Sequence, residues 1–365
     1  MSVIANVAVL PQEKAPLRIE TLKLPDPGSH QVLLRLFASG ICHSQLHQMH
    51  RDRPSPVVLG HEATGIVMAT GKDVHHVKEG DHAFVTWVPR DVKAGGRLPI
   101  IATLETSAGL AVSENVYTWA DHTLADEQYV VKVAEDVRTD VTAIIGCAVM
   151  TGAGAVLNTA GVRAGESVAI FGVGGVGLSA VVAARMRGAN PIIAVDLDDA
   201  KLEFAKRFGA THGINASRED AVEAIHALTA KEGAYTIFQQ PVSGADYTFD
   251  CIGIKKTMEQ IVPACRGGHF GKAQGGTAVL VGVPMTSMEL QALDVLLHEK
   301  RFVGSIGGSC VPDRDFPTFI DWFASGELDL DAMVTERFEL EDINRATDAL
   351  EAGRISGRAI LDYRG

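Results

Sequence analysis

The pattern of hydrophobic and polar positions changes character along the chain. Up to about residue 145, alternating or β-branched runs such as HQVLLRLFASG, VVLGHEATGIVMATG and DHAFVTWV are separated by Gly, Pro and Asp turns, which predicts a strand-rich region. From about residue 166, strand-like runs alternate with helical ones: SVAIF precedes LSAVVAARMRG, and PIIAVD precedes DDAKLEFAKRFG. This alternation predicts a parallel sheet that is covered by helices on both faces.

The last part of the chain predicts a return to the first region. From about residue 306 it carries two short helical runs, FPTFIDWFASG and EDINRATDALEAG, and a final strand, RAILDY. A chain of 365 residues is long for one core. We therefore expect an α/β protein in which a β-rich domain, residues 1–150, is followed by a doubly wound domain, 151–303, and completed by residues 304–365.

Composition and charge exclude several classes of protein. The chain is 46% hydrophobic and 21% charged, and its net charge of −12 opposes binding to nucleic acid. The uncharged segment 167–184 approaches the length of a membrane span, but its glycines and strand-like start predict a strand, a turn and a helix instead. The first residues lack a basic signal region, and five Cys are too few for a disulfide framework. We expect a cytoplasmic protein that binds neither nucleic acid nor membranes.

A glycine-rich motif indicates a dinucleotide cofactor. VAIFGVGGVG gives Gly172, Gly174 and Gly177 the G-x-G-x-x-G spacing directly after a strand and before a helix. The first Gly allows a tight turn, the second lets a pyrophosphate approach, and the third lets helix and strand pack closely. Asp196 ends the next strand, where a carboxylate accepts hydrogen bonds from ribose hydroxyls and repels a 2′-phosphate. The pattern favours NAD over NADP; the alternative is a Gly-rich turn without a ligand.

Three separated residues could form a zinc site. GICHSQLH contains Cys42, GHE contains His61, and AIIGCAVMTGAGA contains Cys147. Zinc takes three or four ligands, so a single Cys–His pair is a poor predictor. Two thiolates and one imidazole would leave one coordination position open, as in catalytic rather than structural zinc sites.

The motifs together resemble a known family. GICHSQLH, GHEATGIV, GDHAFV, GCAVMTGAGAV, FGVGGVGLS and VDLDDAKLEFAKRFGAT occur in the order found in zinc-dependent alcohol dehydrogenases of the medium-chain dehydrogenase/reductase superfamily, and the similarity continues to GRISGRAILDY. The resemblance implies a GroES-like catalytic domain and a Rossmann coenzyme domain, with zinc at the base of the cleft between them. It also implies NAD(H)-linked interconversion of a primary or secondary alcohol and its aldehyde or ketone by hydride transfer, in a homodimer or homotetramer.

The resemblance further implies roles for individual residues. The catalytic zinc would be bound by Cys42, His61 and Cys147. Glu62 would assist ligand exchange at the zinc, Ser44 would contact the alcohol, and His47 would pass its proton to solvent. Trp87 would line the substrate pocket, although an aromatic residue in a strand is often plain core. The coenzyme would be held by His43, Thr151, Gly172, Gly174, Gly175, Val176, Gly177, Asp196, Lys201, Val281 and Arg358.

The chain departs from the family at three places. Many relatives carry four Cys for a second, structural zinc, whereas residues 87–115 here contain none, so we expect one zinc and some other packing for this lobe. Gln45 stands where an Asp commonly orients the zinc-bound imidazole, and we expect its amide oxygen to accept that hydrogen bond from His61. His43 replaces an Arg that grips the pyrophosphate in some relatives, which leaves Arg358 as the cationic contact.

Other functions remain as alternatives. A thiol-adduct dehydrogenase of the formaldehyde type would need polar or cationic groups around the substrate. A zinc-free quinone or enone reductase would lack the Cys and His ligands. A catalytically silent NAD-binding protein would have no use for Ser44 and His47 beside a metal. The sequence does not identify the substrate.

Overall fold

The computed structural model describes residues 3–13, 15–90, 96–236, 238–269 and 274–364, and we treat its two compact units separately. Unit 1 contains Met1–Ala148 and Val311–Gly365, and unit 2 contains Val149–Cys310. The expected return at residue 304 differs from this division, since residues 304–310 cluster with unit 2. The reason is local packing: the Cys310 thiol donates a hydrogen bond to the carbonyl oxygen of Met150 at 3.3 Å.

Unit 1 is built on two mostly antiparallel sheets. The first has the strand order β2-β1-β4-β8-β7, and the second has the order β10-β6-β5-β3-β18-β17, with β9 also paired to β3. The strands of the first sheet are β1 (Val3–Leu10), β2 (Arg18–Leu24), β4 (Val57–Val58), β7 (Thr103–Thr106) and β8 (Gly109–Val112). Those of the second are β3 (Gln31–Ile41), β5 (Ala63–Thr70), β6 (His82–Val85), β9 (His122–Asp126), β10 (Val130–Lys132), β17 (Val334–Phe338) and β18 (Arg358–Asp362).

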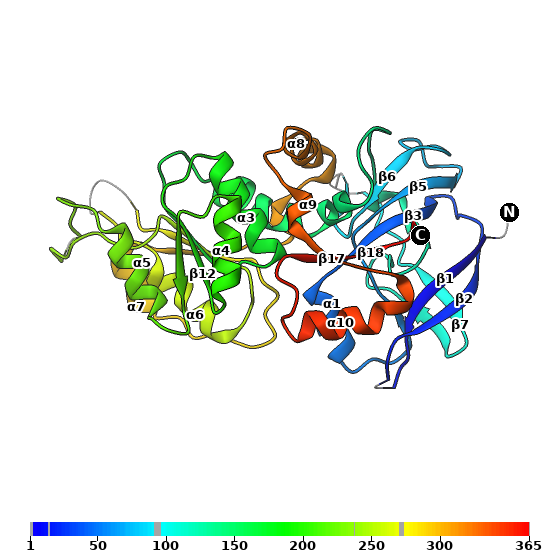
Figure 1. The fold of residues 1–365 in the computed structure, drawn as a ribbon, viewed down its shortest axis with the longest axis horizontal. Helices are drawn as coiled ribbons and strands as arrows, with labels where there is room; N and C mark the ends of the chain where they lie inside the picture. Colours follow the sequence, from blue (N-terminus) through cyan, green and yellow to red (C-terminus); the bar gives the residue numbers. More distant parts are fainter. Residues whose placement is uncertain (1–2, 14, 91–95, 237, 270–273, 365) are drawn as a thin grey trace. The chain divides into compact units, whose positions relative to one another are not determined.

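The strand β3 organises unit 1. Its residues are largely buried, and it pairs with β5, β9 and β18. The pairing with β18 is antiparallel and runs from Ala359 opposite Ile41 to Asp362 opposite Ala38, so the end of the chain completes the sheet that its beginning starts (Figure 1). The strand predicted from RAILDY is therefore present. Cys42 directly follows β3.

Short helices close unit 1. They are α1 (His43–His50), η1 (Glu127–Tyr129), η2 (Val141–Gly146), α8 (Pro312–Ala324), α9 (Leu330–Met333), η5 (Leu340–Asp342) and α10 (Ile343–Glu351). Helices α1 and α10 lie side by side (Figure 1). Leu46 of α1 and Ile343 of α10 share a buried hydrophobic cluster with Trp119. This packing holds α1 in a fixed position, and α1 carries several of the predicted site residues.

Unit 2 is a six-stranded parallel sheet with the order β13-β12-β11-β14-β15-β16. Its strands are β11 (Val168–Phe171), β12 (Ile192–Asp196), β13 (His212–Asn215), β14 (Tyr247–Asp250), β15 (Thr277–Leu280) and β16 (Arg301–Gly304). The helices are α2 (Ala148–Gly154, which begins at the last residue of unit 1), η3 (Ala155–Ala160), α3 (Gly175–Met186), α4 (Asp199–Phe208), α5 (Ala221–Thr229), α6 (Lys255–Ala264), α7 (Ala292–His298) and η4 (Gly307–Ser309). The predicted doubly wound parallel sheet is confirmed, and the strands and helices predicted from SVAIF, LSAVVAARMRG, PIIAVD and DDAKLEFAKRFG are present as β11, α3, β12 and α4.

The strand order creates a switch point between β11 and β14. The chain runs outward from β11 through β12 to β13 and then returns to β14 beside β11. Because parallel crossovers are right-handed, the helices of the two halves cover opposite faces, and ligands of such sheets bind at the carboxyl ends of the strands at this point. The uncharged segment 167–184 forms β11 and most of α3. No helix of the described residues is long and apolar enough to cross a membrane.

Candidate metal and coenzyme site

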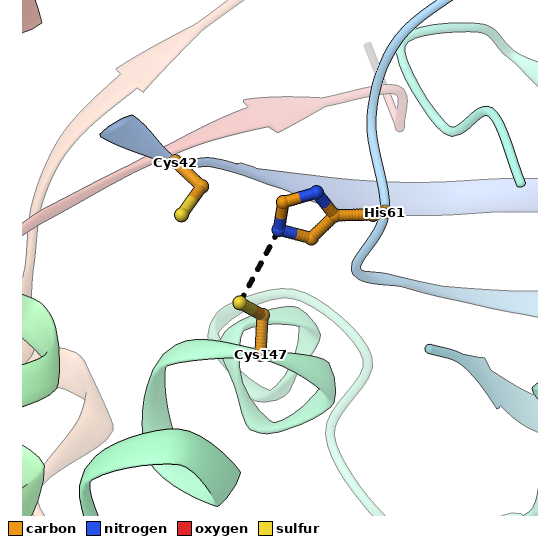
Figure 2. Close-up of side chains that lie close together, drawn as sticks. All are labelled: Cys42, His61 and Cys147. Carbon is orange, nitrogen blue, oxygen red and sulfur yellow. Dashed lines mark hydrogen bonds between the residues drawn. The ribbon is translucent and has the colours of Figure 1, made fainter. Parts of the chain in front are cut away.

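The three predicted ligand residues meet in unit 1. Cys42 lies between β3 and α1, His61 between β4 and β5, and Cys147 between η2 and α2. Their ligand atoms all lie within 4.8 Å of one another, and His61 Nε2 is 3.2 Å from the Cys147 sulfur (Figure 2). Both Cys side chains are buried. The structure thus brings together residues that are far apart in the sequence.

The chemistry of this donor set fits zinc. Two sulfurs and one imidazole nitrogen are the ligand types that zinc prefers, and three protein ligands are typical of its catalytic sites. The hydrogen bond from the Cys147 thiol lowers the pKa of Cys42 well below its usual value, with burial opposing the shift and the charge of Arg358 supporting it. The same hydrogen bond raises the pKa of Cys147, because its proton is held between the two sulfurs. A metal cation would displace that proton, since thiolates are the species that coordinate metals.

Glu62 is buried beside this cluster and has a partner that the sequence did not indicate. Its Oε1 accepts a hydrogen bond from the Arg358 guanidinium, and its Oε2 accepts one from the backbone N–H of Ala148 at 3.2 Å. Burial raises the pKa of Glu62, and the charge of Arg358 opposes this rise. A Cβ on Gly40 would lie 2.2 Å from Glu62 Oε1, so only a glycine fits there. Glu62 and Arg358 therefore form a preorganised ion pair behind the candidate ligands.

This ion pair changes the expectation for Arg358. We expected an available cation that contacts the coenzyme, but Arg358 is 5% exposed and its guanidinium is engaged with Glu62. Residues 62 and 358 are remote in sequence, and only the pairing of β18 with β3 brings them together. A contact between Arg358 and the coenzyme stays a prediction.

Helix α1 carries the two residues of the predicted proton path. The hydroxyl of Ser44 donates a hydrogen bond to the Cys42 sulfur at 3.3 Å, which places it directly beside a candidate ligand. His47 is half-buried one turn later, on the same side of the helix. Burial lowers the pKa of His47, and its Nδ1 is buried with no hydrogen-bond partner among the described residues. His43, the first residue of α1, is exposed.

The expectation for Gln45 is wrong. Its side-chain oxygen accepts a hydrogen bond from the backbone N–H of Cys42 at 3.3 Å, in the manner of a helix capping box. In the part of the chain that the structure describes, Gln45 makes no hydrogen bond to His61, and its Nε2 is without a partner. The difference arises because the third residue of a helix reaches back to the residue that precedes the helix.

Trp87 lies next to a candidate ligand rather than in a remote core. Its ring centroid is 6.3 Å from that of His61, with an edge-on arrangement of 65°. The side chain is half-buried, and its indole N–H has no partner within the described ranges. The geometry is compatible with a pocket wall.

The glycine-rich turn follows β11 in unit 2. Gly172 has a φ of +85°, a conformation that favours glycine, and a Cβ on Gly177 would lie 1.9 Å from the carbonyl oxygen of Gly172. A Cβ on Gly174 would meet nothing within 4 Å, so the backbone is accessible there. The Asp196 carboxylate accepts a hydrogen bond from the backbone N–H of Val173 at 3.1 Å. These features suit a pyrophosphate at the start of α3 and a ribose at the end of β12.

The remaining coenzyme residues lie in unit 2 as well. Thr151 in α2 is buried, and its hydroxyl lacks a partner among the described residues. Lys201 lies half-buried in α4, and Val281 directly follows β15. Gly175 and Val176 begin α3. Their contacts with a coenzyme stay predictions.

A parallel sheet with a glycine-rich turn and a β-rich unit with a Cys–His–Cys cluster define a class, the metal-dependent dehydrogenases that use a dinucleotide. Residues 28–135 match the family model described as alcohol dehydrogenase GroES-like domain, and residues 175–325 match that of zinc-binding dehydrogenase. The alcohol dehydrogenase class-3 of Cereibacter sphaeroides is 33% identical over 95% of this chain and 97% of that protein. The S-(hydroxymethyl)glutathione dehydrogenase of Paracoccus denitrificans is 31% identical over 98% and 99%.

Solved structures agree with these relatives. An alcohol dehydrogenase zinc-binding domain protein from Burkholderia ambifaria has a TM-score of 0.86 at 31% identity, and a benzyl alcohol dehydrogenase from Acinetobacter calcoaceticus has a TM-score of 0.83 at 28% identity. Each comparison covers 99% of both chains. This chain belongs to the zinc-dependent alcohol dehydrogenases of the medium-chain dehydrogenase/reductase superfamily. It is an oxidoreductase of the dehydrogenase type in a zinc-binding family, and Cys42, His61 and Cys147 form its candidate metal site.

Proposed function

We propose that this protein is an NAD(H)-linked dehydrogenase that acts on an alcohol at a single zinc held by Cys42, His61 and Cys147. The observation that carries the proposal is the convergence of these three buried ligand atoms within 4.8 Å. When bound, zinc acts as a Lewis acid that makes an alcohol proton acidic near neutral pH and, in the reverse direction, polarises a carbonyl group.

The residues around the ligands would handle the proton. Ser44 Oγ lies 3.3 Å from the Cys42 sulfur, so its hydroxyl, which can donate and accept, would contact an alcohol held beside that ligand. His47 is kept neutral at physiological pH because burial lowers its pKa, so its ring can accept the proton. The ion pair of Glu62 with Arg358 would hold negative charge beside the ligands without exposing it to water.

The coenzyme is proposed to be NAD. The Asp196 carboxylate is fixed by the backbone N–H groups of Val173 at 3.1 Å and Leu197 at 2.8 Å. A fixed carboxylate can accept hydrogen bonds from both ribose hydroxyls and repels a 2′-phosphate. Asp198 and Asp199 add negative charge on the following residues.

The substrate is proposed to be the hydroxymethyl adduct of a small thiol. The support comes from relatives that align with nearly the whole chain and are named S-(hydroxymethyl)glutathione dehydrogenase, among them those of Paracoccus denitrificans and Synechocystis. A free benzylic alcohol is the second candidate. It is favoured by the flat ring of Trp87 beside His61 and by the similarity to the Acinetobacter calcoaceticus benzyl alcohol dehydrogenase.

A substrate comparison separates the two candidates. Protein of known zinc content is supplied with NAD and either formaldehyde plus glutathione, formaldehyde alone, or benzyl alcohol, and NADH formation is followed by absorbance. We expect the highest kcat/KM with formaldehyde plus glutathione and little turnover with formaldehyde alone. A benzyl alcohol kcat/KM more than tenfold higher would favour the second candidate. Zinc-loaded protein that forms NADH with none of them, nor with aliphatic alcohols, would refute the dehydrogenase proposal.

We also infer a cytoplasmic location and a homo-oligomeric state. All five Cys are free thiols in the structure, which suits a reducing compartment. Self-association is supported by strand β16, which ends the unit 2 sheet, and by the exposed Leu293 and Leu296 of the preceding helix α7.

A further inference from the structure

The backbone N–H and the carbonyl oxygen of Cys42 both form hydrogen bonds with one residue, Gln45. The backbone N–H of Cys42 donates to Gln45 Oε1 at 3.3 Å, and the carbonyl oxygen of Cys42 accepts from the backbone N–H of Gln45 at 3.1 Å. The Cys42 side chain is held separately, since its sulfur accepts from the Ser44 hydroxyl at 3.3 Å. The first three residues of α1 thus fix the peptide and the sulfur of a candidate zinc ligand.

The surroundings of Gln45 hold its side chain in a fixed position. Its side chain is 1% exposed, and the adjacent Leu46 packs in the cluster around Trp119. The bond from Cys42 determines which end of the amide is the oxygen, because only the oxygen can accept from an N–H. Turning the amide over would set two donors against each other. The side chain therefore has one favourable orientation.

This orientation leaves the amide nitrogen unsatisfied. Gln45 Nε2 is buried with no partner among the residues that the structure describes. A buried donor without an acceptor is unfavourable, and sites that tolerate one are often functional. An apolar residue of the same size would avoid this cost, but it could not accept the hydrogen bond from Cys42. The acceptor is therefore the feature of Gln45 that the structure uses.

We propose that Gln45 is a positioning residue for Cys42: by holding the Cys42 peptide, it fixes the direction of the thiolate and so sets how tightly the zinc is retained. This inference rests on the proposed function in one respect, that Cys42 is a zinc ligand. Its action is on the thiolate and not on the imidazole of His61. Residues that orient metal ligands typically change metal affinity ten- to a hundredfold when they are replaced.

The test compares three variants of the full chain. Gln45→Met keeps the length and removes the acceptor, while Gln45→Glu keeps an acceptor at the same reach. Gln48→Met makes the same chemical change one turn later in α1, where it breaks the hydrogen bond from Gln48 to Glu114 at 2.6 Å. The dissociation constant for zinc is measured by competition with a chromophoric chelator, the rate of zinc loss by stopped-flow, and folding by circular dichroism and thermal melting.

We expect Gln45→Met to weaken zinc binding at least tenfold and to release zinc faster, with Gln45→Glu and Gln48→Met within about threefold of the wild type. A lower melting temperature shared by Gln45→Met and Gln48→Met, with zinc affinity lost only in the first, would separate positioning from general stability. If Gln45→Met does not fold, Gln45→Asn replaces it, because its shorter amide cannot reach the Cys42 N–H.

Two results would overturn the inference. One is a folded Gln45→Met chain that retains zinc as tightly as the wild type, and the other is a Gln45→Glu chain that loses zinc as severely as Gln45→Met. Both leave the proposed function intact if the wild type holds zinc and oxidises an alcohol. A wild-type protein that holds no zinc would instead refute the proposed function and, with it, the basis of this inference.

Discussion

The guanidinium of Arg97 donates two hydrogen bonds to the carboxylate of Asp126, at 2.7 and 3.0 Å. The Asp126 side chain is completely buried and also accepts from the backbone N–H groups of Ile100 at 2.7 Å and Gln128 at 2.9 Å. This ion pair ties the segment after residue 96, which belongs to the lobe that contains no Cys, to the end of β9 outside that lobe. It supplies the alternative packing that the sequence led us to expect there, while residues 91–95 of the lobe lie outside the described residues.

Replacing Arg97 should loosen this lobe. Arg97→Met leaves a buried carboxylate without its cation, and because Arg97 is about one-third exposed we expect a loss of roughly 2 kcal/mol in the free energy of unfolding. Urea unfolding and limited proteolysis of the 96–115 region measure the effect. Arg51→Met is the control, because its ion pair with Glu114 is 3.5 Å long and exposed, and its loss should cost under about 0.5 kcal/mol. Equal stability of the two variants would contradict the role of Arg97.

Zinc content tests the ligand set. Mass spectrometry of dialysed protein should find about one zinc per chain, because three converging ligands form one site. Cys147→Ala should remove the zinc and abolish NAD-dependent alcohol oxidation while NADH binding, followed by fluorescence, remains. Cys265→Ala is the control, since Cys265 is a buried thiol in unit 2 that bonds to Thr248. A second zinc retained after dialysis, or activity in the Cys147 variant, would refute the assignment.

Asp196 should determine the preference for NAD. Asp196→Asn keeps an acceptor for the Val173 N–H but removes the negative charge that repels a 2′-phosphate. We expect kcat/KM with NAD to fall several-fold and kcat/KM with NADP to rise, so that the ratio drops at least tenfold. Asp220→Asn removes a charge elsewhere in unit 2, where Asp220 caps α5, and should leave the ratio unchanged. An unaltered ratio in Asp196→Asn would show that this carboxylate does not contact the ribose.

His47 should control the acidic side of the pH profile. Burial lowers the pKa of His47 below its usual 6.5, so the ring is neutral and able to accept a proton at neutral pH, and it loses this ability only as the pH falls through the lowered pKa. Alcohol oxidation by the wild type should therefore decline on the acidic side. His47→Gln should slow oxidation roughly tenfold at pH 7, flatten this decline, and respond to added imidazole. If His47→Gln shows the same pH profile as the wild type, or if added imidazole does not restore its rate of oxidation, His47 is not part of the proton path.

The parts of the site that the sequence predicted share a physical basis. The turn at Gly172 and the carboxylate of Asp196 follow from local backbone requirements, because a positive φ and a strand end are encoded in adjacent residues. The meeting of Cys42, His61 and Cys147 was implied by the family resemblance, since spacing alone does not bring together residues from three loops.

What the sequence could not predict depends on long-range contacts or on competition between partners. The bond between Glu62 and Arg358 needs β18 to lie beside β3, and neither segment alone indicates that pairing. The side-chain oxygen of Gln45 could accept a hydrogen bond from either the backbone N–H of Cys42 or the imidazole of His61. In the structure it accepts from Cys42, which is nearer in the sequence. A capping-box reading of the helix start, with Gln at its third position, would have found this bond.

Self-association should involve the free edge of the unit 2 sheet. Strand β16 is the last of the six parallel strands and, among the residues that the structure describes, it pairs on one side only, with β15. The preceding helix α7 exposes Leu293 at 65% and Leu296 at 73%, and Ile306 after β16 is 78% exposed. An open strand edge flanked by exposed apolar side chains favours pairing with a second copy.

A charge introduced among the exposed apolar side chains Leu293, Leu296 and Ile306 should therefore dissociate the oligomer. We expect Leu296→Lys to shift the mass measured by light scattering at micromolar concentration from a dimer or tetramer toward a monomer, because burying a lysine against a second copy is unfavourable. Leu98→Lys introduces the same charge at a site in unit 1 that is 85% exposed, and its mass should remain that of the wild type. If the wild type is itself monomeric, or if the Leu296 variant keeps the wild-type mass, the β16 edge is not the interface.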